Sequence, residues 1–156
     1  MKRSLVGMGL AALLALQWLH GENSAMEPFK PTLQMQKKLS IEKLKAQNLN
    51  VVQKAVEGIR PTLPQKVDDY TRIVAIDSNG TRLIYTYEVD GGSKSDEALR
   101  KEGRSRMAPV VKEGICQNSR RFLEADIDIR YRYISKRTKN EILRVDVSKN
   151  DCNRAP

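Results

Sequence analysis

Two pairs of aspartates are the residues of this chain whose type and spacing could support acid–base chemistry. Asp68 and Asp69 are adjacent, and Asp126 and Asp128 are two positions apart. Two carboxylates that flank a substrate are the catalytic arrangement of most glycoside hydrolases. The first pair, however, precedes a predicted strand, where Asp is common because its side chain stabilises turns. The second pair falls on the polar face of another strand. We therefore expect structural roles for all four, with a carboxylate-based hydrolase as the less favoured alternative.

The residues that other common catalytic sites require are scarce in this chain. The 156-residue chain has a single histidine, His20, and a single tryptophan, Trp18, both within its first 25 residues. Serine and cysteine nucleophiles are usually activated by an imidazole, and zinc sites draw mainly on Cys and His. Gly91-Gly92 is followed by neither Gly-Lys-Ser/Thr nor the third glycine of a phosphate-binding loop. We expect no catalytic residues, no metal and no cofactor.

Cys116 and Cys152 are the only cysteines in the chain. An exported protein meets an oxidising compartment, so we predict an intramolecular disulfide between them. Closing a loop of this length stabilises a fold by on the order of 4 kcal/mol in the chain-entropy model. Free buried thiols or an intermolecular bridge are the alternatives.

Arginines and tyrosines stand out on the predicted strands. Arg130, Arg132 and Arg144 lie on polar strand faces and could form a basic stripe for an acidic partner segment. Cross-strand pairing with neighbouring acidic residues is the simpler role and is favoured. Four tyrosines on the apolar faces are expected to belong to the core, with a stacking platform for a ligand as the alternative. These are Tyr85, Tyr87, Tyr131 and Tyr133.

The first 25 residues have the plan of a secretory signal peptide. Two basic residues precede an apolar run over residues 5–19, and Ala25 offers a small residue at a cut site. A retained membrane anchor is the alternative, but the run contains Gln17 and is shorter than the roughly 20 apolar residues that span a bilayer. No cysteine stands near its end, so we expect no lipid attachment there. The sequence predicts a periplasmic protein, anchored in the inner membrane if the leader is retained.

The chain is basic. It has 28 Lys and Arg against 19 Asp and Glu, and removal of residues 1–25 takes away two basic residues and one acidic residue, which leaves a formal charge of +8. This charge is compatible with acidic partners or an anionic membrane surface, but a solvated basic surface is the simpler interpretation and is favoured. Because the basic residues are spread along the chain and the protein is predicted to be exported, we expect no nucleic-acid partner.

The sequence divides into the leader (1–25), a basic linker that is helical or flexible (26–47) and a single domain (48–156). Apolar residues are sparse among the Lys and Gln of the linker, which favours a solvated helix or spacer over a helix on the membrane surface. Asn50 is a good N-cap for a helix over residues 51–59, where Val, Ala and Ile recur with helical spacing.

Alternating apolar and polar residues predict two hairpins. The first joins strands over 71–76 and 82–89 through Asn79-Gly80, because both residues tolerate the positive φ of a tight turn. The second joins strands over 127–133 and 143–147.

Between the hairpins, a helix is predicted to open at residues 93–96 and to end at residues 114–117, with a kink or split at Gly103 and Pro109. A short helical turn through Leu123 follows it. The order helix, hairpin, helix, hairpin predicts an α+β fold. Its antiparallel sheet of four to five strands is covered by helices on one face.

Short motifs run through the predicted strands and the cysteines. They are Leu63-Pro64, Val67-Asp68, Thr71, Leu83-Ile84-Tyr85-Thr86-Tyr87, Ile115-Cys116, Arg121-Phe122-Leu123, Ile129-Arg130-Tyr131-Arg132-Tyr133 and Asp151-Cys152. In this succession, over residues 60–152, the chain resembles small exported bacterial domains that include the beta-class pilotins of type II secretion. The motifs are structural rather than catalytic.

The resemblance implies a sheet flanked by helices, a disulfide between Cys116 and Cys152, and a groove that binds a short segment of a secretin subunit. Pilotins of this class guide secretin subunits to the outer membrane through a lipidated N-terminal cysteine, which this leader lacks. We therefore expect a non-catalytic periplasmic module that binds an envelope protein, such as a secretin-type subunit or peptide segment, and assists a secretion complex. A periplasmic inhibitor or immunity protein is the alternative within the binding class.

Overall fold

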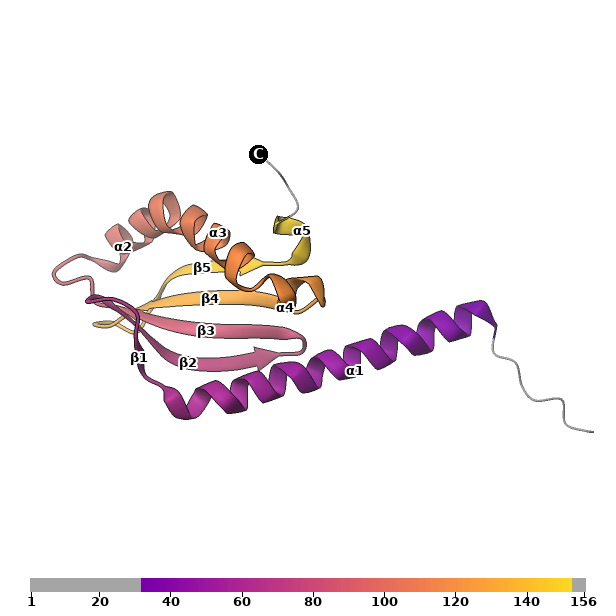
Figure 1. Ribbon diagram of the computed structural model, residues 1–156. Helices are drawn as coiled ribbons and strands as arrows, with labels where there is room; N and C mark the ends of the chain where they lie inside the picture. The colour runs from indigo at the N-terminus through magenta and orange to yellow at the C-terminus, as the bar shows by residue number, and fades with distance from the viewer. Residues whose placement is uncertain (1–31, 153–156) are drawn as a thin grey trace, which may run out of the picture.

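The computed structural model describes residues 32–152, in which helices pack against a five-stranded sheet (Figure 1). Within this part of the chain, none of the helices combines the length and apolar character needed to span a bilayer. The predicted leader, with His20, Trp18 and the apolar run, lies outside the described residues.

The first helix, α1, spans Leu33–Ile59 and is longer than the sequence predicts. Its N-cap is Thr32, whose Oγ1 accepts a hydrogen bond from the Met35 N–H at 3.3 Å. The predicted start after Asn50 is wrong, because Lys, Gln, Leu and Ala carry the helix through residues 33–47 with no proline or glycine to stop it. A 3₁₀ turn, Arg60–Thr62, follows α1.

Only the second half of α1 docks on the domain. Val52 and Val56 are buried, and Asn48 Nδ2 donates to the Ala125 carbonyl at 2.5 Å. Residues 33–47 are exposed throughout, and Figure 1 shows this half of the helix extending beyond the sheet. The described part of the predicted basic linker, residues 33–47, therefore continues into the docked helix without a break.

The strands follow one another across the sheet in chain order. They are β1 (Gln65–Lys66), β2 (Thr71–Asn79), β3 (Arg82–Val89), β4 (Asp128–Ser135) and β5 (Glu141–Val147). Both predicted hairpins are confirmed as the antiparallel pairs β2–β3 and β4–β5. The prediction of a wholly antiparallel sheet is wrong, because β3 and β4 run parallel, with Arg82 opposite Asp128 and Val89 opposite Ser135. The sheet is therefore mixed.

The first hairpin turns one residue later than predicted. Asn79 is the last residue of β2 and pairs with Arg82, so Gly80 and Thr81 form a two-residue loop. Gly80 has φ +60°, whereas neither Asn79 nor Thr81 has positive φ. Positive φ at the first loop residue alone is the pattern of a type II′ turn, which favours glycine there.

The connection from β3 to β4 carries three helices and a π-helical turn. They are α2 (Asp96–Glu102), the π turn (Gly103–Met107), α3 (Ala108–Asn118) and α4 (Arg120–Glu124). Ser95 caps α2 by accepting the Ala98 N–H at 3.2 Å. The predicted split near Gly103 and Pro109 is confirmed: the π turn ends where α3 begins, and proline is tolerated in the first turn of a helix because it lacks an N–H.

One hydrophobic cluster unites the helices with a single face of the sheet. Cross-strand partners point to the same face, and the row Leu83, Ile129, Val147 is almost wholly buried. Helices α1 to α4 each add a buried side chain to the same cluster. These are Val52 and Val56 from α1, Leu99 from α2, Ile115 from α3 and Leu123 from α4. The expected α+β fold with helices on one face is confirmed.

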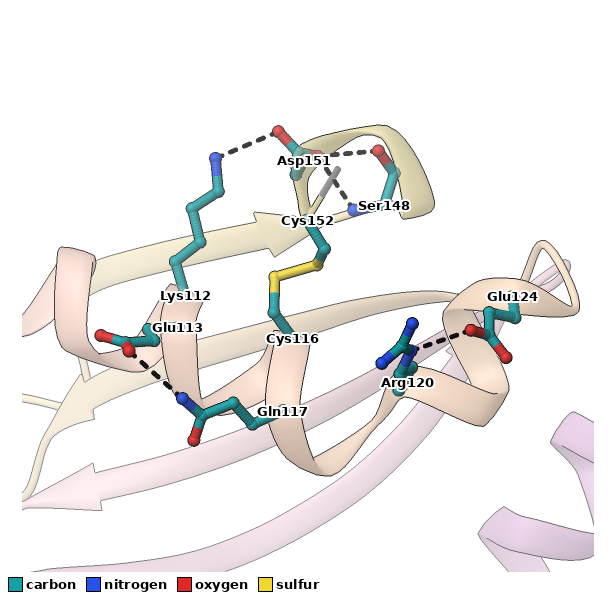
Figure 2. The surroundings of a disulfide bond; sticks show 9 residues. All are labelled: Lys112, Glu113, Cys116, Gln117, Arg120, Glu124, Ser148, Asp151 and Cys152. Atoms are coloured by element: carbon teal, nitrogen blue, oxygen red, sulfur yellow. Dashed lines mark hydrogen bonds and ion pairs between the residues drawn. A yellow bond between two sulfur atoms is a disulfide. The ribbon is translucent and has the colours of Figure 1, made fainter. Parts of the chain in front are cut away.

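The predicted disulfide joins Cys116 in α3 to Cys152 in the short helix α5, Lys149–Cys152 (Figure 2). Asp151 holds α5 in place, because its Oδ2 accepts from the N–H and Oγ of Ser148 at 2.9 and 2.7 Å. Lys112 Nζ lies 3.2 Å from the other carboxylate oxygen. These hydrogen bonds lower the pKa of Asp151 to about 2. The disulfide and the Lys112–Asp151 ion pair thus join the segment after β5 to α3, in the connection between β3 and β4.

Loss of the disulfide should lower the free energy of unfolding by on the order of 4 kcal/mol. The bridge closes a loop with a sequence separation of 36 residues, which restricts the unfolded chain. Urea unfolding with and without reductant measures the loss, and the Cys116→Ser/Cys152→Ser variant is the control because reductant should not change its stability. Equal stability of the oxidised and reduced protein would contradict the prediction.

Docking of α1 predicts different effects for substitutions in its two halves. Val52→Ala should lower the free energy of unfolding by about 2 kcal/mol, because it leaves a cavity under the helix. Leu39→Ala, in the exposed half, should change it by less than about 0.5 kcal/mol. Urea unfolding of both variants checks the difference, and a large loss with Leu39→Ala would mean that the exposed half also packs on the domain.

Candidate binding cleft

The four tyrosines predicted for the core lie together at the centre of the helix-covered face. Tyr85 and Tyr131 meet edge to face with ring centroids 5.4 Å apart. Tyr87 lies 4.8 Å from both Tyr131 and Tyr133 and stacks on the latter. Burial raises the pKa of Tyr85, Tyr87 and Tyr133, so their hydroxyls stay neutral near pH 7. Because Tyr85 and Tyr131 are only half-buried, the cluster is both part of the core and part of an accessible face.

An apolar cleft of about 520 Å³ opens at the end of this face where β3 stops. It lies between α2 and the segment that joins β1 to β2. Its apolar lining comes from Tyr70, Val89, Leu99, Met107 and Ile142. A volume of this size suits a few side chains of a peptide or a small ligand.

Gly91 gives the cleft wall its close packing. A Cβ built on this residue would stand 2.7 Å from Leu99 Cδ1, which is closer than real side chains approach. A larger residue would force Leu99 out of its place beside the cleft. Glycine at position 91 therefore allows the Leu99 side chain to pack directly against the backbone and to line the cleft.

Charged residues of both signs form the rim of the cleft. Asp68 accepts the Tyr70 N–H at 2.8 Å, and its negative charge contributes to the raised pKa of Tyr133. Lys94 of the rim pairs with Glu102 at 2.6 Å, and Asp90 pairs with Lys136 just outside the cleft at 2.7 Å, which lowers the pKa of Asp90. The rim can therefore contact polar groups of either sign around an apolar centre.

The aspartates considered for acid–base chemistry do not form one site. Asp69 pairs with Lys66 at 2.7 Å, beside the cleft at the end of β3. Asp128 pairs with Arg82 at the start of the same strand. Asp126 follows α4 with φ +60°, and its carboxylate is 4.0 Å from Lys149. The two pairs stand at opposite ends of β3, and each aspartate has a structural partner.

The three candidate arginines lie on the opposite, polar face of the sheet, away from the cleft. Arg130 pairs with Asp146 at 2.6 Å, and Arg144 pairs with Glu141 at 2.9 Å. Arg132 is exposed, and within residues 32–152 it has no ion pair. Of the three, only Arg130 has the cross-strand pairing favoured at the outset, because Arg144 pairs within its own strand and Arg132 lies opposite Arg144.

Glu88 is a charged residue that the sequence did not single out. Its side chain on β3 is only 6% exposed, and it pairs with Arg72 at 2.8 Å and with Lys139. These two cations lower the pKa of Glu88 despite burial. The only signal in the sequence was its place on the polar side of an alternating strand, which does not distinguish a buried charge from an exposed one.

No group of three or more His, Cys, Asp or Glu that could hold a metal ion occurs in the described residues 32–152. The arrangement that remains is an apolar cleft with a charged rim, suited to recognition of another molecule.

No protein-family model and no curated protein matches the chain. Among solved structures, a candidate secreted protein of Pseudomonas aeruginosa has 14% sequence identity and a TM-score of 0.61, covering 70% of this chain and 96% of that protein. The type 2 secretion pilotin EpsS of Vibrio vulnificus has 13% identity and a TM-score of 0.57, covering 73% of this chain and 99% of EpsS. The type II secretion pilotin AspS of Vibrio cholerae has 13% identity and a TM-score of 0.54, with 72% and 99% covered.

The chain has the fold of the type II secretion pilotins. The resemblance found in its short motifs is thus confirmed for the fold. At 13–14% sequence identity, the similarity shows a shared fold.

Glu88→Gln should destabilise the protein at pH 7 and do so less in acid. The folded pKa of Glu88 lies below its ordinary value of 4.5, so the carboxylate stabilises the fold above that value, and this stabilisation is lost as the pH falls through the folded pKa. We expect a loss of about 1.5 kcal/mol in the free energy of unfolding at pH 7.

Denaturant unfolding at pH 7 and at several values below 4.5 measures this difference. Glu57→Gln, at an exposed position on α1, is the matched control and should have little effect at either pH. A Glu88→Gln deficit that stays constant into acid would show that the negative charge is not the stabilising feature.

Proposed function

We propose that this protein is a non-catalytic periplasmic module that binds a segment of an envelope protein and assists the assembly or stability of a secretion complex. The observation that carries the proposal is the apolar cleft beside the tyrosine cluster. The partner segment inserts apolar side chains between α2 and the β1–β2 connection, and the charged rim contacts its polar groups.

The side chains around the cleft support protein binding. Tyr70 is 70% exposed and Val67 is 53% exposed, although both are large apolar side chains on one short connection. Exposed apolar residues beside a concave apolar surface are typical of interaction sites. Tyrosine is also enriched among the residues that dominate binding energy in protein interfaces.

The pilotin fold supports the choice of partner. Two solved structures with this fold are described as pilotins of type II secretion systems. By this analogy the partner is a secretin-type subunit or peptide segment. The predicted leader contains no cysteine for lipid attachment, so the proposed role is binding in the periplasm rather than delivery by a lipid anchor.

A non-catalytic role is consistent with the partners of the candidate acidic residues. Asp69 and Asp128 are committed to Lys66 and Arg82. Asp68 uses its carboxylate to hold the loop that forms the cleft rim. These contacts account for the aspartates without a reaction.

Site-specific cross-linking tests the partner and the cleft together. A photoreactive amino acid placed at Tyr70 should cross-link to a subunit of a secretion complex in intact cells. Val110, which is 69% exposed on α3 and outside the cleft lining, is the matched control and should not give that product. Recovery of a secreted toxin instead of a channel subunit would favour an inhibitor or immunity protein and overturn the proposal.

Substitution in the cleft gives the corresponding affinity test. Tyr70→Ala should weaken binding of the purified partner at least about tenfold, because truncating an aromatic hot-spot residue removes about 2 kcal/mol or more of binding free energy. The fold should persist, since the Tyr70 side chain is mostly exposed. Unchanged affinity, measured by calorimetry, would place the binding surface elsewhere. A hydrolase activity lost with Asp68→Asn would contradict the non-catalytic assignment.

A further inference from the structure

Four basic residues stand close together beside the helical wall of the cleft. We name this group the basic ridge: it consists of Arg100 and Lys101 on α2 and of Arg104 and Arg106 on the π turn. Glu102, the one acidic residue among them, lines the cleft, and so does Met107 at the end of the π turn. The basic ridge therefore borders the cleft directly.

The basic ridge has no acidic partner of its own. Within residues 32–152, none of its four members takes part in an ion pair, and Arg100 Nε donates to the Glu141 carbonyl at 3.2 Å. Glu102 pairs instead with Lys94 at 2.6 Å. Lys94 lowers the pKa of Glu102, and Arg106 adds a smaller contribution. The ridge is thus left with an excess of positive charge.

Most other basic residues that follow α1 are paired with an acidic residue. They are Arg60, Lys66, Arg72, Arg82, Lys94, Lys112, Arg120, Arg130, Lys136, Lys139, Arg144 and Lys149. Outside the basic ridge, only Arg121, Arg132 and Arg137 lack such a partner among the described residues 60–152. The lysines of α1 are unpaired as well, but α1 contributes nothing to the cleft lining. Unpaired positive charge is therefore concentrated beside the cleft.

The π turn supports the two arginines of the ridge on a closely packed backbone. Gly103 is buried, and a Cβ built there would lie 3.4 Å from Leu143 Cβ on β5. Ser105 Oγ donates to the Lys101 carbonyl at 3.0 Å and satisfies a backbone acceptor of the helix. Residues 104–106 are all exposed. The arginine side chains thus extend into solvent from a segment that is fixed on the sheet.

The two walls of the cleft differ in charge. The connection from β1 to β2 carries Asp68, which accepts the Tyr70 N–H and has no ion pair in the described part of the chain. The wall formed by α2 and the π turn carries the basic ridge. A flat anionic surface would meet both walls at once and would be repelled by Asp68, because like charges at an interface are unfavourable. A peptide segment places acidic side chains against one wall only, so the charge pattern favours a polypeptide over a lipid surface.

We propose that the basic ridge binds acidic side chains of the partner segment whose apolar side chains fill the cleft. This binding mode rests on the proposed function of the cleft and specifies the chemistry of its partner. Arginine guanidinium groups bind carboxylates through paired hydrogen bonds, and charges at an interface rim set the orientation and association rate of a partner. The partner segment therefore carries Asp or Glu close in sequence to its apolar anchor residues.

A random peptide library displayed on phage tests the preference for acidic partners. The target is the protein purified as the cell processes it. Peptides that bind this protein but not its Tyr70→Ala variant should be enriched in Asp and Glu next to apolar residues, relative to the unselected library. Selection against Arg104→Glu/Arg106→Glu should enrich Lys and Arg instead, because the charge of the ridge is then reversed.

Arg121→Glu/Arg132→Glu is the matched control. It makes the same change in net charge at two exposed arginines that lie outside the cleft lining. Figure 1 shows α4, which carries Arg121, at the opposite end of the helical layer from α2. Selection against this variant should keep the preference for acidic peptides.

The affinity for one selected acidic peptide gives the quantitative readout. Arg104→Glu/Arg106→Glu should weaken binding at least about tenfold at low salt, whereas the control variant should change it by less than about twofold. The wild-type affinity should fall as the salt concentration rises, because salt screens charges at an exposed rim. Arg104→Gln/Arg106→Gln, which removes the charge without reversing it, should give a smaller loss. Thermal unfolding of each variant reports whether it folds.

The possible outcomes separate the basic ridge from the cleft. Tyr70-dependent peptides without acidic enrichment, or equal effects of the ridge and control variants, would overturn the role of the ridge and leave the cleft in place. Absence of any Tyr70-dependent peptide would overturn the cleft and the ridge together. Sedimentation with phosphatidylglycerol vesicles that Arg104→Glu/Arg106→Glu abolishes and Tyr70→Ala does not would assign the ridge to a lipid surface and overturn the proposal.

Discussion

The parallel pairing of β3 with β4 is the constraint on which the rest of this structure depends. The hairpins β2–β3 and β4–β5 could have been joined with β3 and β4 antiparallel, and a short connection between the two strands would then have been enough. Parallel neighbours instead require the chain to return along the full length of the strand before it re-enters the sheet. The segment from Asp90 to Ile127 makes this return and carries α2, the π turn, α3 and α4. The crossover therefore supplies most of the helical layer.

The crossover also accounts for the cleft and the disulfide. It leaves the sheet at Gly91 beside Leu99, so the cleft forms where β3 ends and α2 begins. It delivers Cys116 on α3 to the side of β5, where the chain emerges toward Cys152. The bridge then fastens the last strand to the helical layer (Figure 2). The same connection thus shapes the proposed binding surface and fastens the last strand of the sheet.

Much of the local structure could be predicted because it depends on neighbouring residues. Alternation in 82–89 and 127–133 identified the strands, and Asn79-Gly80 marked the hairpin. The disulfide could be predicted for a different reason, because the chain has only two cysteines. The start of α1 was missed, because a good N-cap at Asn50 says nothing about whether the helix has already begun. The cleft was missed as well, since Tyr70, Leu99 and Ile142 are far apart in the sequence and no local pattern connects them.

The sequence by itself determined the α+β class, the two hairpins and the tyrosine-bearing apolar face, because periodicity and turn residues are local properties. It also indicated the disulfide, because two cysteines allow a single intramolecular pairing. The leader and export remain predictions from the sequence. Only the tertiary structure decided that β3 and β4 are parallel, since hairpins of identical sequence can be joined in either direction. It also decided which charges are buried: Glu88 and Asp146 are both acidic residues on polar strand faces. The central position of β3 buries Glu88 between two cations, whereas the edge position of β5 leaves Asp146 exposed to solvent beside Arg130.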